Sequence, residues 1–174
     1  MMRILVISLP RTGSTSFSKN LALSNNLSFV FEPFAPQAKQ FNKLKNFDID
    51  YNKKNVVVKT LVNDEYDINW FINLSKEFDK VYLLSRKDLV KCIESWAYLT
   101  HKRNELSDFD FETEYYWEKT PNYDESERQI LRWSKKLESI ATELKEEILY
   151  YEDIFGHNNN KLRKGDKGIN RQLI

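Results

Sequence analysis

The residues best suited to chemistry lie in one short segment near the N-terminus, Leu9-Pro10-Arg11-Thr12-Gly13-Ser14-Thr15-Ser16. The segment falls between a predicted strand and a predicted helix, where unpaired backbone N–H groups at the positive end of the helix dipole attract anions. Gly13 lets the backbone approach such an anion, and Arg11 offers a planar fork of donors. The hydroxyls that follow either cap the helix or reach phosphate oxygens. We therefore expect a phosphate-binding loop formed by Arg11, Thr12, Gly13, Ser14, Thr15 and Ser16.

Other interpretations of this loop fit the residues less well. An ATP-binding P-loop needs an earlier glycine and a lysine, and both are missing here. A tyrosine-phosphatase loop needs a nucleophilic cysteine, which is also missing. Leu9 to Gly13 match a sortase sorting signal, but such a signal belongs near the C-terminus of a secreted protein. Taken alone, the loop is also compatible with an ordinary capped turn between a strand and a helix.

The elements around the loop predict an α/β fold. Runs rich in β-branched residues predict strands at Arg3 to Ser8, Ser28 to Phe31, Asn55 to Thr60, Lys80 to Ser85 and Glu147 to Tyr151. Helix-length segments are Ser14 to Leu23, Tyr66 to Phe78, Asp88 to Arg103 and Asp124 to Glu146. This alternation predicts a parallel sheet covered by helices on both faces, with right-handed crossovers. In such sheets ligands gather at the carboxyl ends of the strands, where the loop lies.

Composition limits the class of protein. The 174 residues, of which 41% are hydrophobic against only 4 Gly and 4 Pro, predict a single folded domain over residues 1–174. A net charge of +1 gives no field that would attract nucleic acid or a membrane surface. The single cysteine, Cys92, and the two histidines argue against disulfides and metal sites. Because the first apolar run, Ile4 to Leu9, suits neither a membrane span nor a signal peptide, we expect a cytoplasmic protein.

Two segments show no clear period. Asp108 to Tyr123 is rich in aromatic residues and is expected to be irregular. From His157 onward the chain is polar and basic, which is typical of a solvated terminus.

Four segments, in order along the chain, resemble motifs of sulfotransferases that use 3′-phosphoadenosine 5′-phosphosulfate (PAPS), in particular small bacterial and carbohydrate-type members. "PRTGST" resembles the loop that binds the 5′-phosphosulfate. "VYLLSRKDLVKCIESW" is similar to the strand-to-helix unit that binds the 3′-phosphate. "ILYYEDIFG" resembles a late strand end of the family, and "LRKGDKG" resembles the loop that closes over the 3′-phosphate. The resemblance covers nearly the whole chain and implies a P-loop-like sulfotransferase fold.

The resemblance implies two sets of donors, one for each anionic end of PAPS. Arg11 and its loop bind the 5′ end. The residues implied for the 3′-phosphate are Arg86, Ser95, Arg163, Lys164 and Gly165. Each has another explanation: Arg86 pairs with Asp88, Ser95 is a helix-face serine, and the tail is solvated. Taken together, however, they favour the sulfotransferase interpretation.

The resemblance also implies catalytic residues. Arg11 and Lys59 occupy the positions of cations near the transferred sulfuryl group. The histidine base of aryl-type members is replaced here by Leu61. Glu32, in "FVFEPF", resembles the Glu-Pro of carbohydrate and bacterial members and is the expected base, because a carboxylate in a partly dry cleft has its pKa raised toward the working pH. Glu-Pro is also an ordinary strand exit, since proline holds the preceding residue extended.

Other features leave alternatives open. The spacing from Arg86 to Ser95 is one residue longer than in aryl-type members, and the usual tryptophan after the loop is Ser16. The acceptor is expected to be a small alcohol, phenol or, on the strength of Glu32, a carbohydrate, with no metal required. The chain is short for a sulfotransferase, so the alternatives are a module that binds PAP or PAPS without turnover and, less favoured, an ATP-dependent kinase-like enzyme.

Overall fold

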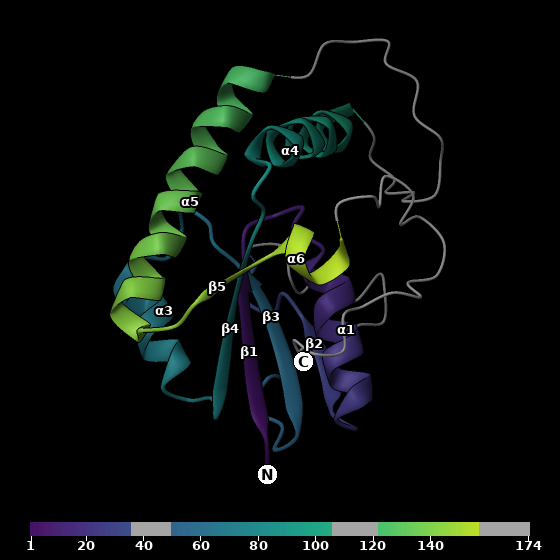
Figure 1. Cartoon of the computed structure of the whole chain (residues 1–174), viewed down its shortest axis with the longest axis vertical. Coiled ribbons are helices and arrows are strands. Elements are labelled where there is room, and N and C mark those ends of the chain that lie inside the picture. Colours follow the sequence, from purple (N-terminus) through teal and green to yellow (C-terminus); the bar gives the residue numbers. More distant parts are fainter. Residues whose placement is uncertain (36–49, 106–121, 157–174) are drawn as a thin grey trace.

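Five parallel strands form one sheet at the centre of the fold (Figure 1). The computed structural model describes residues 1–35, 50–105 and 122–156. The strands are β1 (Arg3–Ser8), β2 (Ser28–Phe31), β3 (Val56–Leu61), β4 (Lys80–Ser85) and β5 (Ile148–Tyr150). Across the sheet they follow the order β2-β3-β1-β4-β5, and every neighbouring pair is parallel. The predicted α/β fold with a parallel sheet is confirmed.

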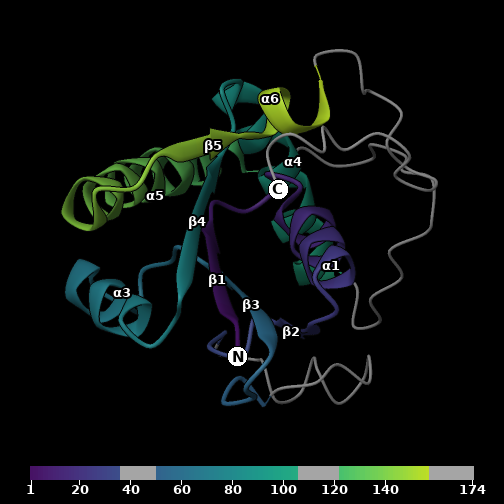
Figure 2. The same ribbon diagram turned by 60° about the horizontal axis from the view of Figure 1, so that its bottom comes forward.

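Helices cover both faces of this sheet, as Figure 2 shows. They are α1 (Ser14–Ser24), α3 (Ile68–Ser75), α4 (Leu89–Glu105), α5 (Tyr123–Leu144) and α6 (Tyr151–Phe155). One apolar cluster joins the sheet to α3, α4 and α5, and a second joins the opposite face to α1 and α6. The strands are therefore apolar on both sides, as expected for a buried parallel sheet.

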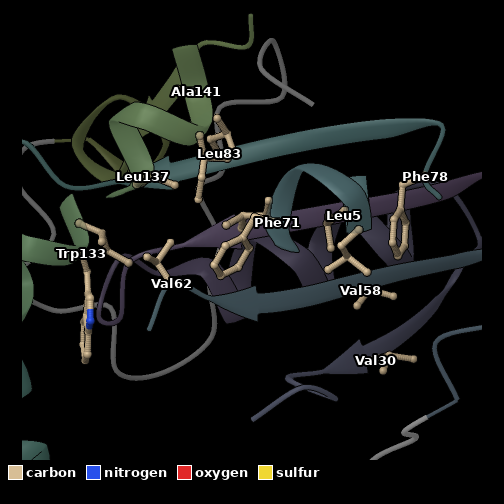
Figure 3. Close-up of a cluster of buried hydrophobic side chains, with 14 of the residues drawn as sticks. Leu5, Val30, Val58, Val62, Phe71, Phe78, Leu83, Trp133, Leu137 and Ala141 are labelled. Atoms are coloured by element: carbon tan, nitrogen blue, oxygen red, sulfur yellow. The ribbon is translucent and has the colours of Figure 1, made fainter. Parts of the chain in front are cut away.

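β1 shows how the two clusters are built. Leu5 and Ile7 belong to the cluster of α3, α4 and α5, whereas Ile4 and Val6 belong to the cluster of α1 and α6. All four side chains are fully buried, and each stabilises the fold by roughly 1.5–3 kcal/mol relative to an exposed position. Figure 3 shows the first cluster, in which Phe71 of α3 lies close to the sheet.

Element boundaries lie within two residues of the sequence predictions, apart from the end of α3. α3 is shorter than the predicted Tyr66 to Phe78 because the Asp67 carboxylate caps its start, accepting a hydrogen bond from Trp70 N at 2.8 Å. The predicted strand Glu147 to Tyr151 is wrong at its end, since β5 stops at Tyr150 and Tyr151 begins α6. No helix was predicted at that position.

The sheet contains a switch point between β1 and β4. From β1 the chain turns through α1 toward β2 at one edge, whereas from β4 it leads toward β5 at the other edge. Connections that part in opposite directions leave a crevice at the carboxyl ends of the two strands, where α/β proteins bind ligands. The loops after β1 and β4 therefore border the expected site.

Within the described ranges, no helix combines the length and the apolar character needed to span a membrane. The expected tail from His157 onward lies outside the described residues, as does the aromatic segment up to residue 121.

Candidate functional site

The loop after β1 holds two residues in the left-handed backbone region. Arg11 has φ 63° and Gly13 has φ 67°. Thr12 is fully buried, and its hydroxyl donates to Leu9 O at 2.8 Å, which closes the turn. Gly13 stands at the N-cap of α1, and no described side chain caps this end of the helix. The first N–H groups of α1 thus have no side-chain cap, and such groups can bind an anion.

Gly13 has a second role, which sequence reasoning missed. A Cβ atom at this position would lie 2.8 Å from Phe155 Cε2 and 2.9 Å from Tyr151 Cδ2. Both rings belong to α6, which packs directly on the loop. Glycine is therefore required here for its backbone conformation and also for the approach of these two aromatic rings.

Helix α4 fixes the loop from another direction. Arg11 Nε donates to Ser95 Oγ at 2.7 Å, and Cys92 Sγ donates to Pro10 O at 3.0 Å. Cys92 is fully buried, and burial raises the pKa of its thiol to about 12. The thiol therefore stays protonated at neutral pH and acts as a hydrogen-bond donor that holds the loop.

Arg86 lies immediately after β4 and reaches the same loop. Its Nη1 donates to Arg11 O at 3.5 Å, and its guanidinium carbon lies 4.7 Å from the centre of the Tyr151 ring. The structure thus brings Arg11, Arg86 and Ser95 together at the switch point. They form one continuous cluster, whereas the sequence suggested two separate sets of donors.

Glu152 of α6 joins this cluster, although sequence reasoning did not select it. Its carboxylate accepts hydrogen bonds from Lys87 N at 2.9 Å and Asp88 N at 3.3 Å, and Oε1 lies 3.4 Å from Arg86 Nε. Burial alone would raise the pKa of Glu152, but the backbone hydrogen bonds and the Arg86 charge outweigh it and hold the pKa below its usual value. Glu152 is therefore an anion beside the predicted 3′-phosphate arginine.

Glu32 and Lys59 form an ion pair at the carboxyl edge of the sheet. Lys59 is 3% exposed, and its Nζ lies 4.6 Å from the centre of the Phe31 ring. Lys59 follows Val57 by two residues on β3, and Val57 packs in the α1 cluster, so both side chains point to the α1 face. Glu32 and Lys59, both expected to be catalytic, thus pair with each other. They lie on the face of the sheet that α1 covers.

The backbone of Glu32 is unusual. Its φ is 43°, a conformation that side chains rarely adopt and that the following Pro33 does not favour. Its N–H donates to Lys59 O at 2.9 Å, and its carbonyl accepts from Ala35 N at 3.2 Å. The alternative considered for Glu32, an ordinary extended strand exit, is therefore not found. A turn held at both ends aims this side chain at Lys59.

Three predicted residues, Arg163, Lys164 and Gly165, lie outside the described residues. Ser14, Thr15 and Ser16 occupy the first turn of α1, as predicted, and Ser14 is buried. Over residues 1–35, 50–105 and 122–156, the histidine, cysteine and acidic side chains form no group of three that could hold a metal ion.

The chain matches no protein-family model and no curated protein sequence.

Proposed function

We propose that this protein is a sulfotransferase that transfers a sulfuryl group from PAPS to an acceptor hydroxyl. The convergence of Arg11, Arg86 and Ser95 beside the uncapped N-terminus of α1 carries the proposal. Two guanidinium groups, a hydroxyl and free helical N–H groups are the donors that a doubly phosphorylated nucleotide requires. Their position between β1 and β4 is that of a ligand site in parallel α/β proteins. A P-loop-like sulfotransferase fold and a cytoplasmic location are parts of this proposal.

The donor set offers groups for both anionic ends of PAPS. The N–H groups of the first turn of α1 and the Arg11 side chain would hold the 5′-phosphosulfate. Arg86 and Ser95 would hold the 3′-phosphate, and the resemblance adds Arg163, Lys164 and Gly165. The hydrogen bond from Arg86 Nη1 to Arg11 O is long, at 3.5 Å. Arg86 therefore retains donor capacity for a phosphate.

Glu32 and Lys59 would supply the proton transfer and the charge. Glu32 accepts the proton of the acceptor hydroxyl as the acceptor oxygen forms its bond to sulfur. The bond between sulfur and the phosphate oxygen breaks, and the electron pair leaves with PAP. Lys59 pairs directly with Glu32 and would offset the negative charge that develops on the leaving oxygen. No step requires a metal ion, and a carbohydrate hydroxyl is the favoured acceptor.

Nucleotide titrations test this function. We expect PAP to raise the thermal midpoint of the full chain more than ATP at equal concentration, because only PAP carries a 3′-phosphate for Arg86. Transfer of labelled sulfate from PAPS to a panel of sugars, alcohols and phenols then tests catalysis. Stabilisation by ATP but not by PAP would favour a kinase-like enzyme instead.

One observation favours the second candidate, a module that binds PAP or PAPS without turnover. The Glu32 carboxylate forms an ion pair with Lys59, and such a pair can have a purely structural role. Stabilisation by PAP without transfer to any member of the panel would identify such a module.

A further inference from the structure

We infer that Glu152 is a positioning residue that aligns Arg86 and thereby determines the preference for a nucleotide with a 3′-phosphate. This inference rests on the proposed function, because it assumes that Arg86 meets that phosphate. Glu152 does not itself touch the nucleotide. It acts by fixing the guanidinium and the backbone that carries it.

The Arg86 guanidinium is constrained on two sides by consecutive residues of α6. The guanidinium carbon lies over the Tyr151 ring, 4.7 Å from the ring centre. Glu152 lies at its Nε edge, with 3.4 Å between Nε and Oε1, and this nitrogen is buried without a hydrogen-bond partner among the described residues. The terminal nitrogen Nη1 reaches the loop after β1, where it donates to Arg11 O. An arginine fixed in this way loses less rotamer freedom on binding an anion.

The same carboxylate also fixes the backbone on which Arg86 is carried. Oε2 accepts from Lys87 N and Oε1 from Asp88 N, the two residues that follow Arg86. Asp88 in turn accepts from Lys91 N at 3.1 Å and so caps the start of α4. Glu152, with 11% of its side chain exposed, therefore links α6 to the turn that sets the direction of Arg86.

Glutamine cannot replace this carboxylate. Each oxygen of Glu152 faces a donor: Lys87 N on one side, and Asp88 N with Arg86 Nε on the other. An amide has only one acceptor oxygen, so its NH₂ group would face at least one of these donors. E152Q therefore releases Arg86 while keeping nearly the same side-chain volume.

Asp153 provides a matched control on the next residue of α6. Its carboxylate pairs with Lys87 Nζ, and both side chains are about half exposed, at 49% for Lys87 and 45% for Asp153. D153N removes one negative charge from the same helix, as E152Q does. In the described structure the Asp153 carboxylate pairs with Lys87 and not with Arg86. A change found in E152Q but not in D153N thus cannot be a net-charge effect.

The experiment measures the dissociation constants of PAP and of adenosine 5′-phosphate by calorimetry on the full chain. We expect wild type and D153N to prefer PAP, and E152Q to lose at least about tenfold of that preference, as is typical when an orienting partner is removed. R86A should remove the preference as well, and E152Q should add nothing in the R86A background. E152D, which keeps both acceptor oxygens but withdraws them by one methylene, should fall between wild type and E152Q and replaces E152Q if that variant does not fold.

The outcomes separate this inference from the function on which it rests. If wild type prefers PAP and E152Q (or E152D) keeps the full preference, the positioning role is overturned and the sulfotransferase proposal stands. If both nucleotides weaken equally in E152Q, Glu152 is merely structural and the inference is again overturned. If wild type shows no preference for PAP, the 3′-phosphate site itself is absent and both proposals fail.

Discussion

At the scale of single residues, Lys59 and Glu32 place opposite charges next to a largely apolar part of the sheet. Val57 and Val58 are fully buried just before Lys59, which is itself only 3% exposed. Burying an ion pair costs desolvation free energy that its attraction does not always restore, so such a pair is weak evidence for a role in stability alone. The left-handed backbone of Glu32, held by hydrogen bonds to Lys59 and Ala35, is a second cost at the same position. Two such costs at one position favour a functional role for this pair.

The first residue-scale prediction concerns Glu32. In E32Q we expect transfer from PAPS to fall by at least about a hundredfold, because the amide cannot accept the acceptor's proton. The dissociation constant for PAP should stay within about twofold, since its phosphates are bound by other residues. Rate measurements at saturating PAPS and calorimetry with PAP check the two halves. Retained PAP binding shows that the variant is folded, and retained turnover would exclude Glu32 as the base.

The sequence pointed to Glu32 and Lys59 but not to the ion pair between them. Glu32 and Lys59 were both selected by resemblance, yet their pairing depends on β2 lying beside β3, with Phe31 opposite Lys59. That register is a long-range property that local patterns do not specify. Glu152 was missed for a related reason: within "YYEDIF" it looks like an exposed acidic residue, and its role arises only where α6 meets the loop after β4.

At the scale of elements, α6 connects the two loops of the candidate site. Phe155 and Tyr151 pack on Gly13 in the loop after β1, and Glu152 binds the loop after β4. Ile154 is buried in the cluster of α1. A helix of five residues is too short for a 3.6-residue pattern to show in the sequence, which is why the segment was predicted to end a strand. The longer helices, whose apolar residues repeat over several turns, were predicted correctly.

The docking of α6 makes a prediction about Gly13. G13A should lower the free energy of unfolding by more than about 2 kcal/mol, because the left-handed backbone alone costs roughly 1–2 kcal/mol and the new methyl group meets Tyr151 and Phe155. Urea denaturation of the two proteins measures the difference.

Gly13→Asn separates these two causes. Asparagine tolerates the left-handed backbone but still carries a Cβ atom. If contact with α6 dominates, G13N should be nearly as destabilised as G13A. A G13N variant as stable as wild type would show that backbone strain, and not the approach of α6, explains the glycine.

At the scale of the whole molecule, the sheet was largely predictable because each strand is a short apolar run bounded by polar residues. β1, β2 and β4 begin and end where the sequence predicted, and β3 is shifted by one residue. The order of the strands was not predicted, since it depends on which crossovers pass over which face. It is this order that places Arg86 beside Arg11, residues far apart in the chain.

Stability should fall in acid. The pKa of Glu152 is held below the usual 4.5 in the folded chain, so folding favours its ionised form. Its contribution to stability is fully present above the unfolded pKa of 4.5. The contribution is lost as the pH falls through the lower pKa of the folded state. The pKa of Asp64, which pairs with Arg132, is also lowered in the folded chain, so Asp64 likewise contributes less stability in acid. The free energy of unfolding, from urea denaturation between about pH 6 and pH 3, should decrease, and it should decrease less steeply in E152Q. An equal slope in E152Q and wild type would contradict the assignment of this carboxylate.

Because β1 and β4 are neighbours in the sheet, the distance between the loops that follow them is fixed. Neighbouring strands lie about 4.8 Å apart, and Leu9 N is bonded to Leu84 O at 3.1 Å where the two strands end. The bases of the two loops therefore cannot spread without breaking the ladder at the middle of the sheet. In the proposed sulfotransferase site, the sheet therefore fixes the separation of the two nucleotide-binding loops, and a pocket for acceptors of different size would have to vary at its periphery.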